Sequence, residues 1–320
     1  MSFKKEVLEH MGDYKRDVLK IEDNGKWWLS KKENSFVTHD HILPVIDGEN
    51  SFQKYSKNNI RKENIISTYR DSCWSYIKTE RIKLQQYYHH LNSSQAMCLN
   101  FFYPFAVNNS IKNSIITAIQ SQCLEKIDIK NPKLMNYEFE HESSLDGYHG
   151  QNPTNFDLCI SGESTKLLFE VKYTEEGFGG IEKKKMATYV EKYDNLYKKL
   201  ALKVISCEWN NCESFIENYQ IMRNLVHIDE SSYLIFLYPE LNVTVKNQAV
   251  KAREFVKPEF RAKLICMTWE TLYQQMFNIL LEVDTMDCFL EQSLLEFRDK
   301  YLYWIDIPKC YRAKSRLSIY

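Results

Sequence analysis

The sequence predicts an α/β protein in which a mixed central β-sheet is flanked by helices and preceded by a helical N-terminal extension. Two segments, 155–161 and 166–173, alternate between apolar and polar residues, as expected for a β-hairpin. A continuous apolar run at 232–238 is typical of a strand buried on both faces, and helical patterns separate it from the hairpin. A further strand is expected at 262–268, followed by another helix. Strands that alternate with helices after an antiparallel hairpin predict a mixed sheet covered by helices.

The hairpin is the stretch around which the chain is organised. Its two segments are joined by the turn-rich Gly162–Thr165, and closure of this turn places Asp157 opposite Glu170, with Lys172 further along the same face. The other face is apolar and is expected to be the core side, which fixes the register. Its members are Phe156, Leu158, Ile160, Leu167, Phe169 and Val171.

The two carboxylates indicate a metal site. Carboxylates this close repel each other, and one pKa rises unless a cation lies between them. Mg²⁺ binds one or two carboxylates together with water and phosphate oxygens, so Asp157 and Glu170 are the expected metal ligands, and Mn²⁺ is expected to substitute. Lys172 is then placed to orient or help deprotonate an attacking water, or to offset charge on a phosphate.

This arrangement of Asp157 and Glu170-Val171-Lys172 on a hairpin resembles the PD-(D/E)XK nuclease superfamily. The longer strings Phe169–Glu175 and Ser93–Asn100 look like a bacterial subgroup of restriction endonucleases, and the resemblance covers residues 91–275. It implies a restriction-endonuclease-like fold and a Mg²⁺-dependent nuclease that hydrolyses phosphodiester bonds. The expected substrate is DNA, in restriction or phage defence, with RNA and a homodimer left open.

The resemblance also implies how the chain is organised. Residues 1–90 are expected to form a helical or irregular extension, and residues 91–320 a nuclease-like domain with C-terminal packing helices.

Auxiliary residues follow from the same resemblance. Many superfamily members carry an acidic residue on the helix before the sheet; here Gln95 is the candidate replacement, with capping or packing as the alternative. Glu175 is a second candidate for an auxiliary ligand or water-positioning group. Gln220 and Arg223, neighbours on a helix expected at 212–228, are candidates for nucleic-acid contact, with a structural salt bridge as the alternative for Arg223.

Two other functions remain open at this stage. One is a non-catalytic nucleic-acid-binding protein that retains the nuclease fold. The other is a glycoside hydrolase with two carboxylates, which the adjacent Lys172 disfavours because it would hold the proton-donating acid ionised.

Composition bears on the possible binding partners and on the cellular compartment of the protein. The net charge of -1 and the pI near 6.7 argue against a protein that coats nucleic acid by bulk charge. The 9 cysteines show no paired spacing and are expected to be reduced thiols of a cytoplasmic protein. No apolar run resembles a signal peptide or a membrane span, so no membrane partner is expected.

Overall fold

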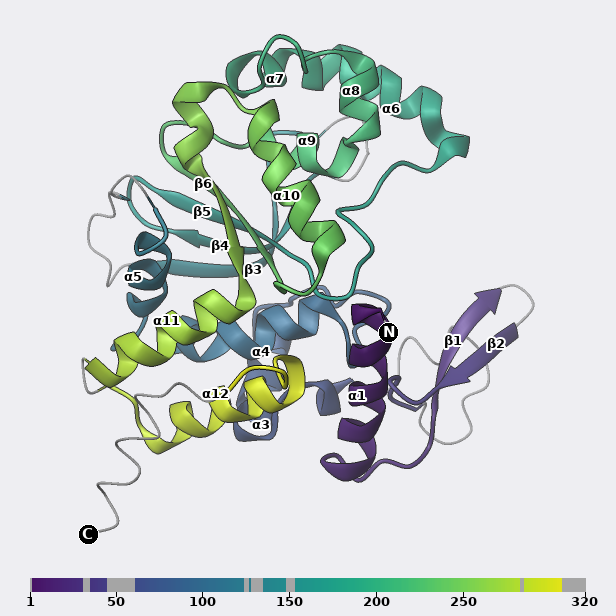
Figure 1. Cartoon of the computed structure of the whole chain (residues 1–320), viewed down its shortest axis with the longest axis vertical. Coiled ribbons are helices and arrows are strands. Elements are labelled where there is room, and N and C mark those ends of the chain that lie inside the picture. Colours follow the sequence, from purple (N-terminus) through teal and green to yellow (C-terminus); the bar gives the residue numbers. More distant parts are fainter. Residues whose placement is uncertain are drawn as a thin grey trace. The chain divides into compact units, whose positions relative to one another are not determined.

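The computed structural model describes residues 2–30, 35–44, 61–123, 127, 135–147, 153–282 and 285–306. The chain divides into two compact units, and each is taken here by itself (Figure 1). The first unit combines residues 1–107 with residues 280–320, and the second comprises residues 108–279.

The first unit is mainly helical. Ser2 caps its first helix by accepting from the N–H of Lys5, and Asp287 caps the last by accepting from the N–H of Leu290. Its helices are α1 (Phe3–Asp17), α3 (Arg70–Thr79), α4 (Ser94–Val107) and α12 (Cys288–Tyr301), with short 3₁₀ turns at Lys62–Asn64 and Ser67–Tyr69. Its strands are β1 (Gly25–Ser30) and β2 (Ser35–His39), which pair antiparallel.

This division differs from the one expected from the sequence, which separated residues 1–90 from everything that follows. The C-terminal helix α12 belongs with the N-terminal residues because its buried face bonds to them. Asn100 Nδ2 donates to Tyr301 Oη at 2.8 Å, and Lys300 Nζ donates to the carbonyl oxygen of Asn64 at 2.5 Å. Residues far apart in sequence therefore share one core.

The second unit contains the five-stranded sheet, with strand order β3-β4-β5-β6-β7. The first three strands pair antiparallel, whereas β6 and β7 continue the sheet in parallel. The strands are β3 (Asn136–Glu142), β4 (Asn155–Ser161), β5 (Lys166–Val171), β6 (Ser232–Tyr238) and β7 (Leu264–Thr268). The predicted mixed sheet flanked by helices, consistent with a restriction-endonuclease-like fold, is thus confirmed.

The register of the hairpin is the predicted one. In the β4–β5 ladder Ser161 pairs with Lys166 and Leu158 pairs with Phe169. Strand β6 is buried along its whole length, as its continuous apolar sequence indicated.

Helices cover both faces of this sheet. Figure 1 shows α9 (Tyr219–Leu225) and α10 (Val243–Phe255) on one side of it and α5 (Ser114–Gln120) and α11 (Trp269–Glu282) on the other. The side of the hairpin that carries Asp157 and Glu170 was expected to face away from the core. Instead, Cys159 and Leu168 on that same side are buried against the helices from α7 (Lys198–Val204) to α10. The reason is that the long connection between the parallel strands β5 and β6 contains helices that pack on this face of the sheet.

The helices of the second unit are shorter than their sequence patterns suggest. The expected helix at 212–228 is interrupted at Asn218, whose backbone leaves the helical region. The helices are α5 (Ser114–Gln120), α6 (Met186–Lys192), α7 (Lys198–Val204), α8 (Cys212–Glu217), α9 (Tyr219–Leu225), α10 (Val243–Phe255) and α11 (Trp269–Glu282), with a π-helical turn at Tyr193–Tyr197.

Candidate active site

Asp157 lies where the β4–β5 ladder ends. The last paired residues are Leu158 and Phe169, so Asp157 and Glu170 occupy the next opposed positions. Instead of a main-chain bond, Asp157 Oδ2 accepts from the N–H of Val171 at 2.7 Å. The carboxylate therefore replaces one rung of the ladder and is fixed by the strand that carries Glu170.

Glu170 lies at the centre of the polar contacts. It is 4% exposed, and both of its carboxylate oxygens are bonded. Lys172 Nζ donates to Oε1 at 2.6 Å, and Asn224 Nδ2 donates to Oε2 at 3.0 Å. Two side chains from different elements thus hold one carboxylate in a single orientation.

Lys172 is anchored through its main chain. Its N–H donates to the carbonyl oxygen of Leu237 at 2.8 Å, and its own carbonyl accepts from Trp269 Nε1 at 3.3 Å. The Lys172 ammonium lies 5.7 Å from the centre of the Phe178 ring, which packs on Phe236. An apolar wall on one side and a carboxylate on the other restrict where this cation can point.

Burial and charge act in opposite directions on these groups. Burial raises the pKa of Asp157 well above its usual value, and the negative charges of Glu170 and Glu140 raise it further. Burial alone would lower the pKa of Lys172, but the charges of Glu170 and Glu175 outweigh it and raise that pKa. The positive charge of Lys172 is therefore too small an influence to keep the pKa of Asp157 at its usual value.

The two auxiliary candidates have other hydrogen-bond partners. Glu175 Oε2 accepts from the N–H of Tyr173 at 2.6 Å, close enough to Lys172 to affect its pKa. Gln95 lies in the first unit, is 2% exposed, and uses its amide to bond the N–H of Gln85 and the carbonyl oxygen of Lys83. These contacts give Gln95 a packing role, and an auxiliary catalytic role for either residue stays a prediction.

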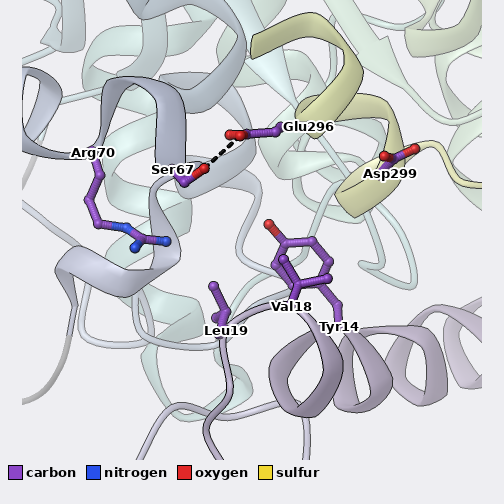
Figure 2. A pocket seen from close by; sticks show the side chains of 7 residues that line it. All are labelled: Tyr14, Val18, Leu19, Ser67, Arg70, Glu296 and Asp299. Atoms are coloured by element: carbon purple, nitrogen blue, oxygen red, sulfur yellow. Dashed lines mark hydrogen bonds between the residues drawn. The ribbon is translucent and has the colours of Figure 1, made fainter. Parts of the chain in front are cut away.

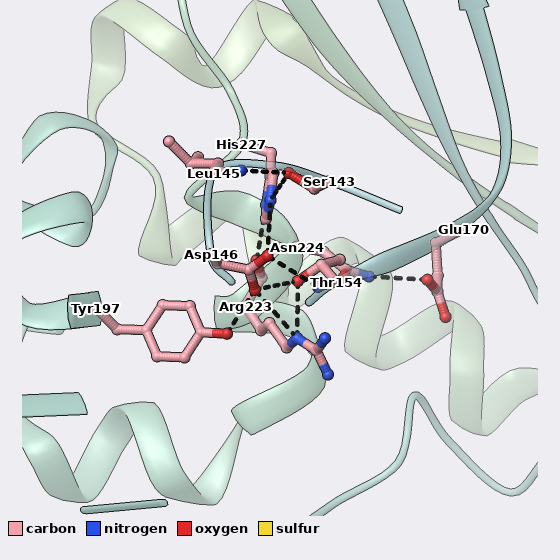
Figure 3. Close-up of polar contacts among 9 residues, drawn as sticks. All are labelled: Ser143, Leu145, Asp146, Thr154, Glu170, Tyr197, Arg223, Asn224 and His227. Carbon is pink, nitrogen blue, oxygen red and sulfur yellow. Dashed lines mark hydrogen bonds and ion pairs between the residues drawn. The ribbon is translucent and has the colours of Figure 1, made fainter. Parts of the chain in front are cut away.

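Arg223 has partners of the kind expected if it forms a structural salt bridge. Its Nε donates to Thr154 Oγ1 at 2.7 Å and lies 3.4 Å from Asp146 Oδ2 (Figure 3). Gln220, one turn earlier on α9, is half-buried. A nucleic-acid contact by Gln220 or Arg223 stays a prediction.

Asp146 is the centre of the buried network in Figure 3. It is fully buried, and it accepts from the N–H and the hydroxyl of Thr154 and from the hydroxyl of Tyr197. His227 Nε2 lies 2.9 Å from Ser143 Oγ and 3.6 Å from Asp146 Oδ1. The network joins the β3–β4 connection, the start of β4 and helix α9, which carries Asn224 toward Glu170.

Sequence reasoning assigned no role to Asn224, to Asp146 or to Glu140. Asp146 lies in a polar connection, and its partners Tyr197 and Arg223 are distant in sequence. Glu140 is in strand β3, yet its backbone has φ +55°, a left-handed conformation that non-glycine residues rarely adopt. Only the acidic composition of β3 could have drawn attention to Glu140, since a left-handed glutamate has no sequence signature.

The donor set fits Mg²⁺ in its chemistry. Asp157 and Glu170 are hard oxygen donors, and one or two carboxylates are what a protein usually contributes to this ion. The side-chain oxygen of Asn224, also a hard donor, is buried and finds no hydrogen-bond donor among the residues that the structure describes. Within the same residues, no three His, Cys, Asp or Glu side chains are grouped to hold a metal.

The first unit contains a separate cavity of about 200 Å³ (Figure 2). Its charged groups are already paired: Glu296 Oε1 accepts from Ser67 Oγ at 2.5 Å, and Arg70 Nη1 lies 2.9 Å from Glu63 Oε2. We assign this cavity no part in the chemistry of the hairpin.

Comparison with known proteins bears directly on the assignment. Residues 10–302 match the model of a family described as a restriction endonuclease associating with ARP. The chain belongs to this restriction endonuclease family. No curated protein and no solved structure matches it. The matched residues include parts of both units and the whole candidate site, so Asp157 and Glu170 lie within the region that defines the family.

None of the helices among the described residues is long and apolar enough to cross a membrane.

Proposed function

We propose that this family member is a metal-dependent endonuclease of the PD-(D/E)XK type that hydrolyses phosphodiester bonds in DNA, in restriction or phage defence. The observation that carries the proposal is the arrangement around Glu170: a lysine and an asparagine hold its carboxylate, and Asp157 occupies the opposed position on the neighbouring strand. The family match supports a nuclease, and the hairpin supplies residues suited to that chemistry.

In this proposal Asp157 and Glu170 would hold Mg²⁺. The ion, when bound, would supply positive charge for a phosphate oxygen and lower the pKa of a bound water. Mn²⁺ is expected to substitute for it. Glu170 keeps its orientation through Asn224, and Asp157 keeps its own through the N–H of Val171.

Lys172 would act on the phosphate side of the site. Its ammonium lies 2.6 Å from Glu170 Oε1, within reach of groups that approach the same carboxylate. From there it can donate to a phosphate oxygen or orient the attacking water, an electrostatic contribution that needs no change in its own position.

Nucleic-acid contacts are proposed for Gln220 and Arg223 on α9, a helix that also carries Asn224. Arg223 uses Nε for Thr154, and the planar guanidinium can donate from more than one edge. The phosphate contact is proposed in addition to this structural bond.

The test is a plasmid-nicking assay with Mg²⁺, run with and without excess chelator. A parallel cleavage assay uses single-stranded RNA as the substrate. The variants are Glu170→Gln and Lys172→Met, with Glu163→Gln, an exposed carboxylate in the hairpin turn, as the matched control. We expect DNA cleavage by the parent and by the control, and its loss with chelator or in Glu170→Gln. Full activity of Glu170→Gln, or parent activity that persists in chelator, would contradict the proposal.

A further inference from the structure

We infer that Asn224 is a positioning residue for Glu170 and that its side-chain oxygen is a further acceptor in the candidate metal site. The inference rests on the proposed function, because it assigns a residue to the same site. The hairpin motif does not include Asn224, which lies on helix α9, outside both strands of the hairpin.

The orientation of the Asn224 amide follows from its partner. The Glu170 carboxylate can only accept, so the nitrogen of the amide must face it, and Nδ2 lies 3.0 Å from Oε2. The amide oxygen then points elsewhere. It is completely buried and has no donor among the described residues.

A buried amide oxygen without a donor costs free energy unless a group outside the protein satisfies it. Beside a carboxylate in a candidate Mg²⁺ site, that group is a hard cation or a water bound to one, since both interact favourably with an amide oxygen. The same side chain thus orients one ligand through its nitrogen and offers an acceptor through its oxygen.

Helix α9 is held so that Asn224 reaches Glu170. Arg223, one residue before Asn224, bonds Thr154. His227, three residues after Asn224, bonds Ser143 and lies 3.6 Å from Asp146 Oδ1. Thr154 immediately precedes β4, the strand that carries Asp157. The network therefore fixes the helix relative to both catalytic strands, as expected of groups that support metal ligands.

The test is calorimetric titration of Mn²⁺ into the full-length protein, so that the readout does not depend on cleavage. Asn224→Ala removes both polar atoms, and Asn224→Leu does so while keeping a similar volume in case the alanine variant folds poorly. Met222→Ala is the matched control: it is fully buried on the same helix and has no polar atom to offer Glu170.

We expect each Asn224 variant to bind Mn²⁺ about 10- to 100-fold more weakly than the parent. The Met222→Ala protein is expected to lose thermal stability while keeping its Mn²⁺ affinity. Asn224 variants that bind Mn²⁺ as tightly as the parent, while Glu170→Ala does not bind, would overturn this inference and leave the proposed function standing. Parent-like Mn²⁺ binding by Glu170→Ala would overturn both.

Discussion

The carboxylate of Asp157 accepts a hydrogen bond from the main-chain N–H of Val171, at the point where the two strands of the hairpin stop pairing. One side chain thus has two tasks: it completes the backbone bonding of β5, and it contributes charge beside Glu170. Substitutions that separate these tasks give the first prediction.

In the metal-free protein, Asp157→Asn keeps an acceptor for Val171 and removes a charge that Glu170 and Glu140 oppose. The pKa of Asp157 is raised on folding, so its ionisation lowers stability as the pH rises above about 3.9, the usual pKa of an aspartate. We expect the asparagine variant to gain stability relative to the parent with rising pH, and the gain to be complete above the folded pKa. Urea unfolding in chelator at several pH values measures it, and a pH-independent difference would contradict the account.

Asp157→Ala removes the acceptor as well as the charge. The N–H of Val171 then lacks its partner, which costs about 1 to 3 kcal/mol if no water replaces it. We expect the alanine variant to be less stable than the asparagine variant at every pH in the same unfolding experiment. Equal stabilities would show that the Val171 bond contributes little.

Lys172→Met should affect chemistry more than metal binding. The lysine bonds Glu170 but is not a metal ligand in this account, so Mn²⁺ affinity should persist. Single-turnover cleavage should slow by on the order of 10² to 10⁴ if the lysine contributes acid-base or electrostatic help. A cleavage rate equal to that of the parent would remove Lys172 from the mechanism.

Asp146→Asn should destabilise the protein in a pH-dependent way. Although burial opposes ionisation, hydrogen bonds from His227, Thr154 and Tyr197 hold the pKa of Asp146 well below its usual value. The carboxylate therefore stabilises the fold above the unfolded pKa of about 3.9, and this contribution is lost as the pH falls through the lower folded pKa. At neutral pH the substitution should cost about 3 kcal/mol, because it disrupts the buried pair with Arg223. The parent and the variant should converge in unfolding experiments at acidic pH, and a constant gap would count against this assignment.

Arg223→Ala should also lower stability, because it leaves Asp146 without its cation. If Arg223 additionally contacts a phosphate, the slope of log affinity for DNA against log salt should fall by roughly 0.7 to 0.9 in the variant. Fluorescence anisotropy at several salt concentrations measures this slope. A lower stability with an unchanged slope would assign Arg223 to the network alone.

Much of the five-stranded sheet follows from patterns that are local in the sequence. The alternation of the two hairpin segments and the turn between them specify the register, and the apolar run 233–238 in β6 indicates a strand buried on both faces. Asp157, Glu170 and Lys172 could be named as candidates from the sequence because they lie within one hairpin. A motif of this kind is carried by residues close in sequence.

The parts that could not be predicted depend on distant contacts. Asn224 meets Glu170, and Asp146 meets Arg223, across long stretches of chain, so no periodicity indicates either pair. The same holds for α12, whose Tyr301 bonds Asn100 and so belongs with the N-terminal unit. Packing on both faces of the hairpin was also missed, because the helices that cover the second face come from parts of the chain distant from the hairpin.

The central claim is that Asp157 and Glu170 together hold a divalent metal. The most direct measurement is a crystal structure of the protein soaked in Mn²⁺, with data collected near the manganese absorption edge. The account predicts one anomalous peak, from an ion bound by carboxylate oxygens of both residues, with the side chain of Asn224 beside the ion. A fully soaked crystal with no peak at these two carboxylates, or with its peak at other residues, would contradict the account.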